Sequence, residues 1–280
     1  MNTHTLFRKL AGILGVTFAL GLSGQAQNLF INFDATTATA PDNAPYVAPG
    51  GNTGLWTTLS PTSATADSHV GSITISYGVK SSWNSIDFGT ITGSSVLRPL
   101  ALGNVYNSGI YATGGVGRGG LLEDSSYSAS NDVALGMQIT GLAVGEYKIY
   151  LSGINTSSTS TLSSLTNNFF LSTSVTKDAN GVVFAADSQL NPTSDFIRGV
   201  QNNTTANTTS WVVGQNYVEL SFTISSADDV LTLISKSTGD DKRGIFNSMQ
   251  IVQIPEPSTW ALIGIGLGFI GILRLRKSRA

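Results

Sequence analysis

The chain has 280 residues, a formal net charge of −2, a charged fraction of only 11% and no cysteine. Without cysteine it has no disulfide framework, zinc–thiolate site, iron–sulfur cluster or thiol nucleophile. Residues 27–254 hold nine Lys and Arg against sixteen Asp and Glu. This acidic balance argues against nucleic acid as a partner, because phosphate binding needs clustered Lys and Arg.

The first 26 residues have the three parts of a secretory signal. Basic Arg8 and Lys9 precede a charge-free run at 10–22, and small residues at 23–26 close the segment. A helix over that run spans about 20 Å, short of a bilayer core of roughly 30 Å, so a retained anchor is the less favoured alternative. We therefore expect residues 1–26 to be a signal peptide, passed through the secretion translocon and removed by signal peptidase after Ala26.

Short runs of β-branched and alternating apolar residues fill the next part of the chain, and helical periodicity is not sustained there. In chain order, we expect strands at 29–33, 72–77, 133–140, 146–151, 168–174, 182–185, 217–224, 230–234 and 247–252, with long irregular loops at 34–68 and 89–130. The sequence therefore predicts an all-β domain at 27–253, built as a two-sheet β-sandwich.

Two pairs of these strands are expected to form hairpins. They join 133–140 to 146–151 through a glycine-containing turn, and 217–224 to 230–234 through a turn with two Asp. Within 146–151, Lys148 and Tyr150 alternate with apolar Ile149, so Lys148 and Tyr150 are expected on the solvent side.

Three segments carry a resemblance of this body to known domains. They are the Gly-Leu-x-x-Gly-x-Tyr pattern at 141–147, the Asn-Leu-Phe-Ile-Asn-Phe-Asp strand at 28–34 and the Asn-Ser-Met-Gln-Ile strand at 247–251. Together they look like the jelly-roll, galactose-binding-like domains of exported bacterial proteins. A different β-sandwich or a β-helix would satisfy much of the same pattern, although no repeat period supports the β-helix.

The carboxyl end carries a tripeptide, an apolar run and a basic tail in that order. The tripeptide is Pro255, Glu256 and Pro257, and the basic residues are Arg274, Arg276, Lys277 and Arg279. The charge-free stretch between them is about 25 Å long as a helix, so we expect one transmembrane helix at about 258–275. The basic tail would then be cytoplasmic and the body outside. A buried core helix is the alternative, which the terminal cations disfavour.

This combination resembles the PEP-CTERM sorting signal of bacterial exported proteins. The resemblance implies that residues 254–280 are recognised by an exosortase, a membrane-embedded Cys transpeptidase that removes the tail near the tripeptide. The protein would pass through the inner membrane and reach the cell surface or extracellular matrix. Its prolines would be substrate rather than catalyst, and they hold the segment extended and open to a processing enzyme.

Residues suited to catalysis are few in the body. His69 is its only histidine, in a setting typical of a loop that leads into a strand. The glycines at 114–120 lack the Lys-Ser/Thr ending of a phosphate-binding loop, so they predict a flexible loop. Adjacent carboxylates predict solvated turns, with calcium binding as the sharper alternative. The calcium candidates are Asp228, Asp229, Asp240 and Asp241. We expect no other cofactor and no enzymatic activity.

Aromatic residues in Ser-, Thr- and Asn-rich stretches are the remaining functional signal, because sugar rings stack on aromatic faces. The glycan-binding candidates are Trp56, Trp83, Tyr106 and Tyr111, with Arg98 and Arg118 as polar partners. Packing of each Trp in the core is the competing interpretation. The sequence favours a non-enzymatic surface or matrix protein that binds extracellular polysaccharide. A polysaccharide-acting enzyme and a purely structural surface component are the alternatives.

Overall fold

The structure is a computed structural model, which describes residues 27–33, 44–52, 54–59, 67–82, 85–88, 97–99, 126–128, 134–153, 166–174, 182–183, 196–202, 210–238 and 244–255. Every regular element in these ranges is a β-strand, and Gln27–Gln253 form one compact unit. We call this unit the body. None of the described residues belongs to a helix long and apolar enough to span a membrane. The expected signal peptide and the helix at about 258–275 lie outside these ranges.

One sheet has five strands. In spatial order they are β13 (Val218–Ile224), β9 (Gly145–Ser152), β16 (Ser248–Ile254), β1 (Asn28–Phe33) and β2 (Trp56–Leu59). The first and last long strands of the body therefore lie side by side. β1 pairs with β16 in antiparallel orientation on one side and with β2 in parallel orientation on the other.

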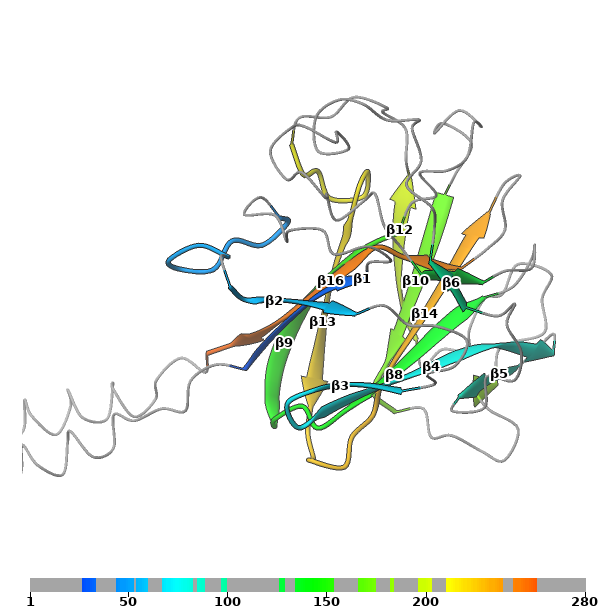
Figure 1. Cartoon of the computed structure of the whole chain (residues 1–280), viewed down its shortest axis with the longest axis horizontal. Helices are drawn as coiled ribbons and strands as arrows, with labels where there is room; N and C mark the ends of the chain where they lie inside the picture. The colour runs from blue at the N-terminus through cyan, green and yellow to red at the C-terminus, as the bar shows by residue number, and fades with distance from the viewer. Residues whose placement is uncertain are drawn as a thin grey trace, which may run out of the picture. The chain divides into compact units, whose positions relative to one another are not determined.

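A second sheet has eight strands. They are β11 (Val182–Val183), β5 (Ser85–Phe88), β4 (Ile73–Ser82), β8 (Leu135–Thr140), β14 (Leu231–Thr238), β10 (Thr166–Ser172) and β12 (Ile197–Asn202), with β3 (Asp67–Val70) also paired to β4. A small third sheet contains β15 (Ile245–Phe246), β7 (Ser126–Ser128) and β6 (Leu97–Pro99). In Figure 1, the five-stranded sheet lies on one side of the body and β4, β8, β10 and β14 lie on the other.

Alternate residues of both large sheets meet in one hydrophobic core. Ile149 of β9 and Ile251 of β16 belong to the same buried cluster as Met137 of β8. Because side chains alternate across a strand, each sheet directs one apolar face inward and keeps the other face outside. The prediction of an all-β, two-sheet β-sandwich is confirmed.

The expected strands are found with ends shifted by a few residues, and several strands were not predicted. The missed strands include β2, β3, β6 and β7 inside the expected loops 34–68 and 89–130, together with β5, β12 and β15. These strands are short, and most carry Ser, Thr or Asn in place of a β-branched apolar run, as Trp56-Thr-Thr-Leu59 shows. His69 accordingly lies in β3 rather than in a loop.

Both predicted hairpins are wrong, and for the same reason. The strands β8 and β9 lie in different sheets, as do β13 and β14, so each connection carries the chain from one sheet to the other. In a hairpin the two apolar faces point the same way, whereas here they face each other across the core, and alternation alone cannot separate these cases. A tight hairpin joins β3 to β4, where Val70 pairs with Ile73 around Gly71 at φ 62°, and β4 to β5, where Ser82 pairs with Ser85.

Candidate functional site

A row of aromatic rings crosses the outer side of the five-stranded sheet, and we call it the aromatic face. Its members are Trp56, Phe30, Tyr46, Tyr150, Tyr217 and Trp211. Taken in that order, neighbouring ring centroids lie 5.4, 6.0, 5.7, 6.2 and 6.2 Å apart. The row is therefore continuous from the edge strand β2 to the edge strand β13.

Strand alternation and register place the centre of this row. Phe30 lies between Leu29 and Ile31, which enter the core, so its ring points outward. Phe30 pairs with Trp56 on one side and with Gln250 on the other, which brings β2 and β16 to the same level of the sheet. Tyr150 of β9 likewise points outward, between two core residues.

Tyr46 is held over the face by the side chain of Gln250, which is only 1% exposed. The Tyr46 backbone N–H donates to Gln250 Oε1 at 3.0 Å, and Gln250 Nε2 donates to the Tyr46 carbonyl oxygen at 2.8 Å. Asn52 Nδ2 donates to the same carbonyl at 2.8 Å. These bonds fix the Tyr46 ring nearly parallel to that of Tyr150, with 28° between the planes.

The other end of the row is organised by Asn216. Its Oδ1 accepts the backbone N–H of Val212 at 2.8 Å, and its Nδ2 donates to the Ser210 carbonyl at 3.0 Å. The turn so formed presents Trp211 edge-on to Tyr217, with 74° between the ring planes. The two ends of the row therefore have separate supports within the fold.

The aromatic face is partly open to solvent and has no net charge. Phe30 and Tyr150 are buried, whereas Tyr46, Trp56, Trp211 and Tyr217 are half-buried. Within the described part of the chain, the charged pair beside the row is Lys148 with Glu219, which form an ion pair across β9 and β13. Hydrogen bonding to Glu219 raises the pKa of Lys148, so Lys148 keeps its positive charge at neutral pH.

The hydroxyls of Tyr150 and Tyr217 on this face are uncharged hydrogen-bonding groups at neutral pH. Burial raises the pKa of Tyr150, and the nearby Glu219 carboxylate raises it further. The same two causes, in the same order, raise the pKa of Tyr217. Both phenols therefore keep their protons well above neutral pH, and each hydroxyl can donate one hydrogen bond and accept others.

A row of amide and hydroxyl groups runs beside the aromatic row on the same side of the sheet. Asn32 follows Phe30 by two positions on β1, Ser152 follows Tyr150 on β9, and Ser248 precedes Gln250 on β16. The hydroxyls of Ser152 and Ser248 lie 2.6 Å apart. Asn32 is fully buried and neither of its side-chain polar atoms has a hydrogen-bond partner, a state that ordered water usually relieves.

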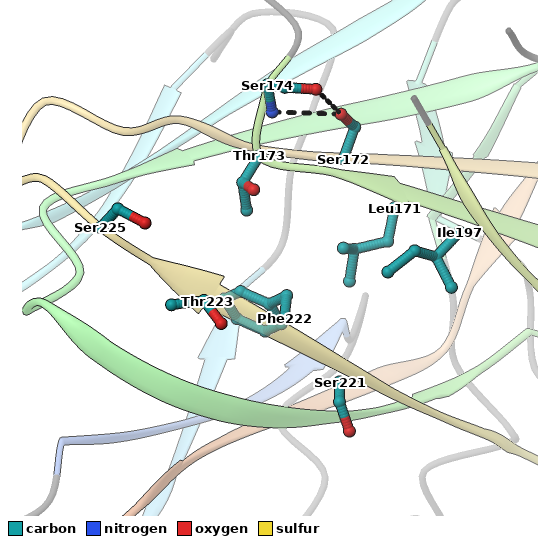
Figure 2. A pocket seen from close by; sticks show the side chains of 9 residues that line it. All are labelled: Leu171, Ser172, Thr173, Ser174, Ile197, Ser221, Phe222, Thr223 and Ser225. Carbon is teal, nitrogen blue, oxygen red and sulfur yellow. Dashed lines mark hydrogen bonds between the residues drawn. The ribbon is translucent and has the colours of Figure 1, made fainter. Parts of the chain in front are cut away.

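A second candidate is an open cavity of about 370 Å³ between the ends of β10, β12 and β13. Figure 2 shows its lining, which combines hydroxyl and apolar side chains: Ser172, Thr173, Ser174, Ser221, Thr223, Ser225, Leu171, Ile197 and Phe222. None of the described residues that line it is titratable, and they offer a neutral ligand hydroxyl groups and apolar surface.

The predicted glycan-binding residues are only partly described. Trp56 lies on the aromatic face, where it contacts Phe30. Trp83, Tyr106, Tyr111 and Arg118 lie outside the described residues, and Arg98 is described only as part of the strand β6. Their grouping stays a prediction. Sequence reasoning missed Tyr46, Tyr217 and Tyr150, and it placed Tyr150 in solvent, whereas the Tyr46 ring covers it.

In the acidic turn between β13 and β14, side-chain oxygens accept hydrogen bonds from the backbone N–H groups of the same turn. Asp229 Oδ2 accepts the backbone N–H groups of Ser225 at 2.6 Å and Ser226 at 3.0 Å, and the Asp228 N–H contacts Ser226 Oγ at 3.3 Å. This geometry fits the turn interpretation. Asp240 and Asp241 lie outside the described residues, among which no group of three or more His, Asp or Glu is placed to hold a metal.

The sorting tripeptide begins directly after the last strand. Ile254 ends β16, and Pro255 follows as an exposed residue with no strand partner. Glu256, Pro257 and the basic residues Arg274, Arg276, Lys277 and Arg279 lie outside the described residues.

Comparisons with solved structures give only distant similarity. A β-glucuronidase 2 of Bacteroides uniformis, covalently bound to cyclophellitol-6-carboxylate aziridine, shares 12% identity at a TM-score of 0.32, over 81% of this chain and 18% of that chain. The plant receptor-like kinase ANX2 shares 11% identity at a TM-score of 0.32, over 65% of this chain and 49% of that chain. The chain thus spans less than half the length of either protein. No curated protein matches it.

One family model matches the carboxyl end. It is the PEP-CTERM protein-sorting motif, over residues 253–277. This match covers the tripeptide, the apolar run and the first basic residues, the features that carry the resemblance seen in the sequence. The motif implies export, transit in a membrane-anchored form and processing by an exosortase. The chain therefore carries a PEP-CTERM protein-sorting motif that begins in the last two residues of the final strand of its β-sandwich body.

Proposed function

We propose that the body is a non-enzymatic module of the cell surface or extracellular matrix, and that it binds neutral polysaccharide through the aromatic face. The observation that carries the proposal is the continuous row of rings across the outer side of the five-stranded sheet. Four of these rings are half-buried, so each offers part of its surface to a ligand. Successive sugar rings can stack on such a row while their hydroxyl groups bond to tyrosine hydroxyls.

The charges favour a neutral sugar chain over an acidic one. Lys148 and Glu219 neutralise each other beside the row. Across residues 27–254, acidic residues outnumber basic ones by sixteen to nine, so the long-range field repels polyanions. A neutral chain meets no such penalty, and stacking would supply most of its binding free energy.

The carboxylates near the row do not suit glycoside hydrolysis, which supports a binding role. That reaction needs two carboxyl groups about 5–10 Å apart across the scissile bond. The carboxylate described beside the row is Glu219, which is engaged by Lys148. A single carboxylate, held in an ion pair, does not supply the two carboxyl groups that the reaction requires.

The test is retention of the processed protein on the producing cell's own extracellular polysaccharide, and on neutral and acidic reference polysaccharides. We expect saturable retention on the neutral material that is insensitive to a calcium chelator. Replacing Tyr46 or Trp56 with Ala should weaken retention roughly fivefold each, because an aromatic stacking contact contributes about 1 kcal/mol beyond its buried area. The release of reducing ends in the same samples would indicate an enzyme instead.

The matched control is Ile197→Ala, which removes an exposed apolar side chain at the second candidate cavity and leaves the aromatic face intact. We expect its retention to equal that of the unmodified protein. If Ile197→Ala weakened retention while Tyr46→Ala and Trp56→Ala did not, the cavity would be the binding site. If no polysaccharide retained the unmodified protein, the proposal would fail in favour of a structural surface component.

A further inference from the structure

The two ends of the body are joined by side chains as well as by strand pairing. The β1–β16 ladder ends where Asn28 pairs with Val252. One residue further out, the Gln253 backbone N–H donates to the Gln27 carbonyl at 3.1 Å, and the Gln27 backbone N–H donates to Gln253 Oε1 at 2.7 Å. The first residue of the body is thus bonded through both its carbonyl and its nitrogen.

The Gln27 side chain reaches the connection between β8 and β9. Its carbonyl oxygen Oε1 accepts the Ala143 backbone N–H at 2.7 Å and lies 3.2 Å from the Tyr147 hydroxyl. That hydroxyl also lies 2.8 Å from the Ala143 carbonyl oxygen, so its single proton is shared between the two acceptors. Donors directed at a carbonyl oxygen polarise the carbonyl and stabilise negative charge that develops there.

We propose that Gln27 is a modification site: once the leader is removed after Ala26, its α-amine closes on its own side chain to give an N-terminal pyroglutamate. The inference rests on the predicted cleavage after Ala26 and is independent of polysaccharide binding. The neutral α-amine nitrogen attacks Cδ, a C–N bond forms, the Cδ–Nε2 bond breaks, and ammonia leaves with one proton from the amine. No oxidant, metal or co-substrate is needed.

The site around Gln27 is complementary to the lactam product. A pyroglutamate ring has one N–H donor and one carbonyl acceptor and carries no charge. Gln253 Oε1 is in place to accept from the ring nitrogen, and Ala143 N–H and the Tyr147 hydroxyl are in place to donate to the ring carbonyl. A free terminal ammonium would find a single uncharged acceptor here, because no hydrogen bond described at Gln27 involves a carboxylate.

The first experiment is mass spectrometry of the N-terminal peptide of the exported protein. We expect a peptide that begins at residue 27 and is lighter than its sequence by one ammonia. A peptide that begins at Gln27 with an intact amine would overturn the proposal. So would a peptide that begins at any other residue, because Gln27 would then have no free amine.

The second experiment asks whether the fold drives the ring closure. Freshly exported protein is held folded or in concentrated urea, and the cyclised fraction is followed with time. We expect closure to be about fivefold faster or more in the folded protein, the rate factor that corresponds to one ordinary hydrogen bond on the developing oxyanion. Equal rates in the folded and unfolded protein would overturn the proposal.

Two variants locate the effect. Gln253→Met removes the acceptor for the Gln27 nitrogen, and Tyr147→Phe removes one donor while keeping the ring stacked on Phe222. We expect each variant to lose most of the folded-state acceleration. The matched control is Gln138→Met, on β8 and bonded to Thr232, which should keep it. Retention on polysaccharide should be unchanged in all three, so this proposal and the proposed function fail separately.

Discussion

Replacing Gln250 with Met tests whether one buried amide positions the aromatic face. Methionine has nearly the volume and length of glutamine, so the change removes two hydrogen bonds to Tyr46 and leaves no large cavity. The carbonyl oxygen of Tyr46 keeps its bond from Asn52, whereas the Tyr46 N–H loses its only described acceptor. The perturbation is therefore confined to the attachment of Tyr46 to the sheet.

The expected magnitude follows from these two bonds. Each contributes about 0.5–1.5 kcal/mol, so the closed position of Tyr46 should lose about 2 kcal/mol. That energy corresponds to roughly a thirtyfold shift toward an open loop. Opening of the loop takes only the Tyr46 ring away from the ligand, so retention should weaken at most as much as in Tyr46→Ala, about fivefold. A domain stable by about 5–15 kcal/mol remains folded after this loss.

The assay combines polysaccharide retention with urea denaturation of the same preparations. Gln138→Met is the matched control, because it also removes a buried strand amide but lies in the other sheet. We expect Gln250→Met to stay folded, with a stability loss of no more than about 2 kcal/mol, and to bind more weakly, and we expect Gln138→Met to bind normally. Equal retention by both variants would refute the idea that Gln250 positions Tyr46 for binding.

Four further outcomes are expected. Gly141→Ala should lower the melting temperature, at a cost of about 2 kcal/mol or more of folding stability. The reason is that Gly141 has φ 87° and an added Cβ would lie 2.5 Å from a backbone oxygen. An unchanged melting temperature would show that this close contact is absent. Burial raises the pKa of Tyr150 and Tyr217 above their ordinary value, so the unfolded chain releases these protons first. The free energy of unfolding measured in urea should therefore keep its full value below about pH 10 and decrease above it. The decrease should be less steep in a Tyr217→Phe variant. Asp229→Asn should cost under about 1 kcal/mol, and a calcium chelator should not shift the melting curve, if the carboxylate only holds its turn. Native protein should lack the apolar tail by mass spectrometry, and Glu256→Ala should retain it; a native protein that still carries the tail would show that exosortase processing does not occur.

The strands of the core were predictable because their signal is local. In β13, buried and exposed residues alternate without exception, as the sequence Val-Glu-Leu-Ser-Phe-Thr-Ile implies. The partner of a strand is not a local property. Gly141 begins a connection that resembles a hairpin turn in sequence, yet β8 pairs with β4 and β14 while β9 pairs with β13. Both arrangements bury the same apolar faces, so periodicity contains no information that separates them.

The aromatic face was only partly predictable for a related reason. Trp56 stands out in a polar stretch, and it does lie on the face. Tyr46 has no such signal, because it is placed by Gln250, which lies 204 positions away in the sequence. Strand alternation correctly predicted that Tyr150 points away from the core, but it does not follow that the residue is exposed to solvent. A second layer of rings covers it, and that layer comes from loops that strand alternation does not describe.

Formation of the face depends on both ends of the body. Phe30, Tyr46 and Trp56 come from the first part of the body, whereas Gln250 and Tyr217 come from its last part. Gln250 meets Phe30 and Tyr46 only when β16 pairs with β1. Such long-range pairing forms late and costs chain entropy before its contacts repay it. The sorting motif begins at residue 253, inside β16. The strand that completes the aromatic face is therefore the one that leads into the sorting motif, so the face cannot assemble without the segment that adjoins the motif.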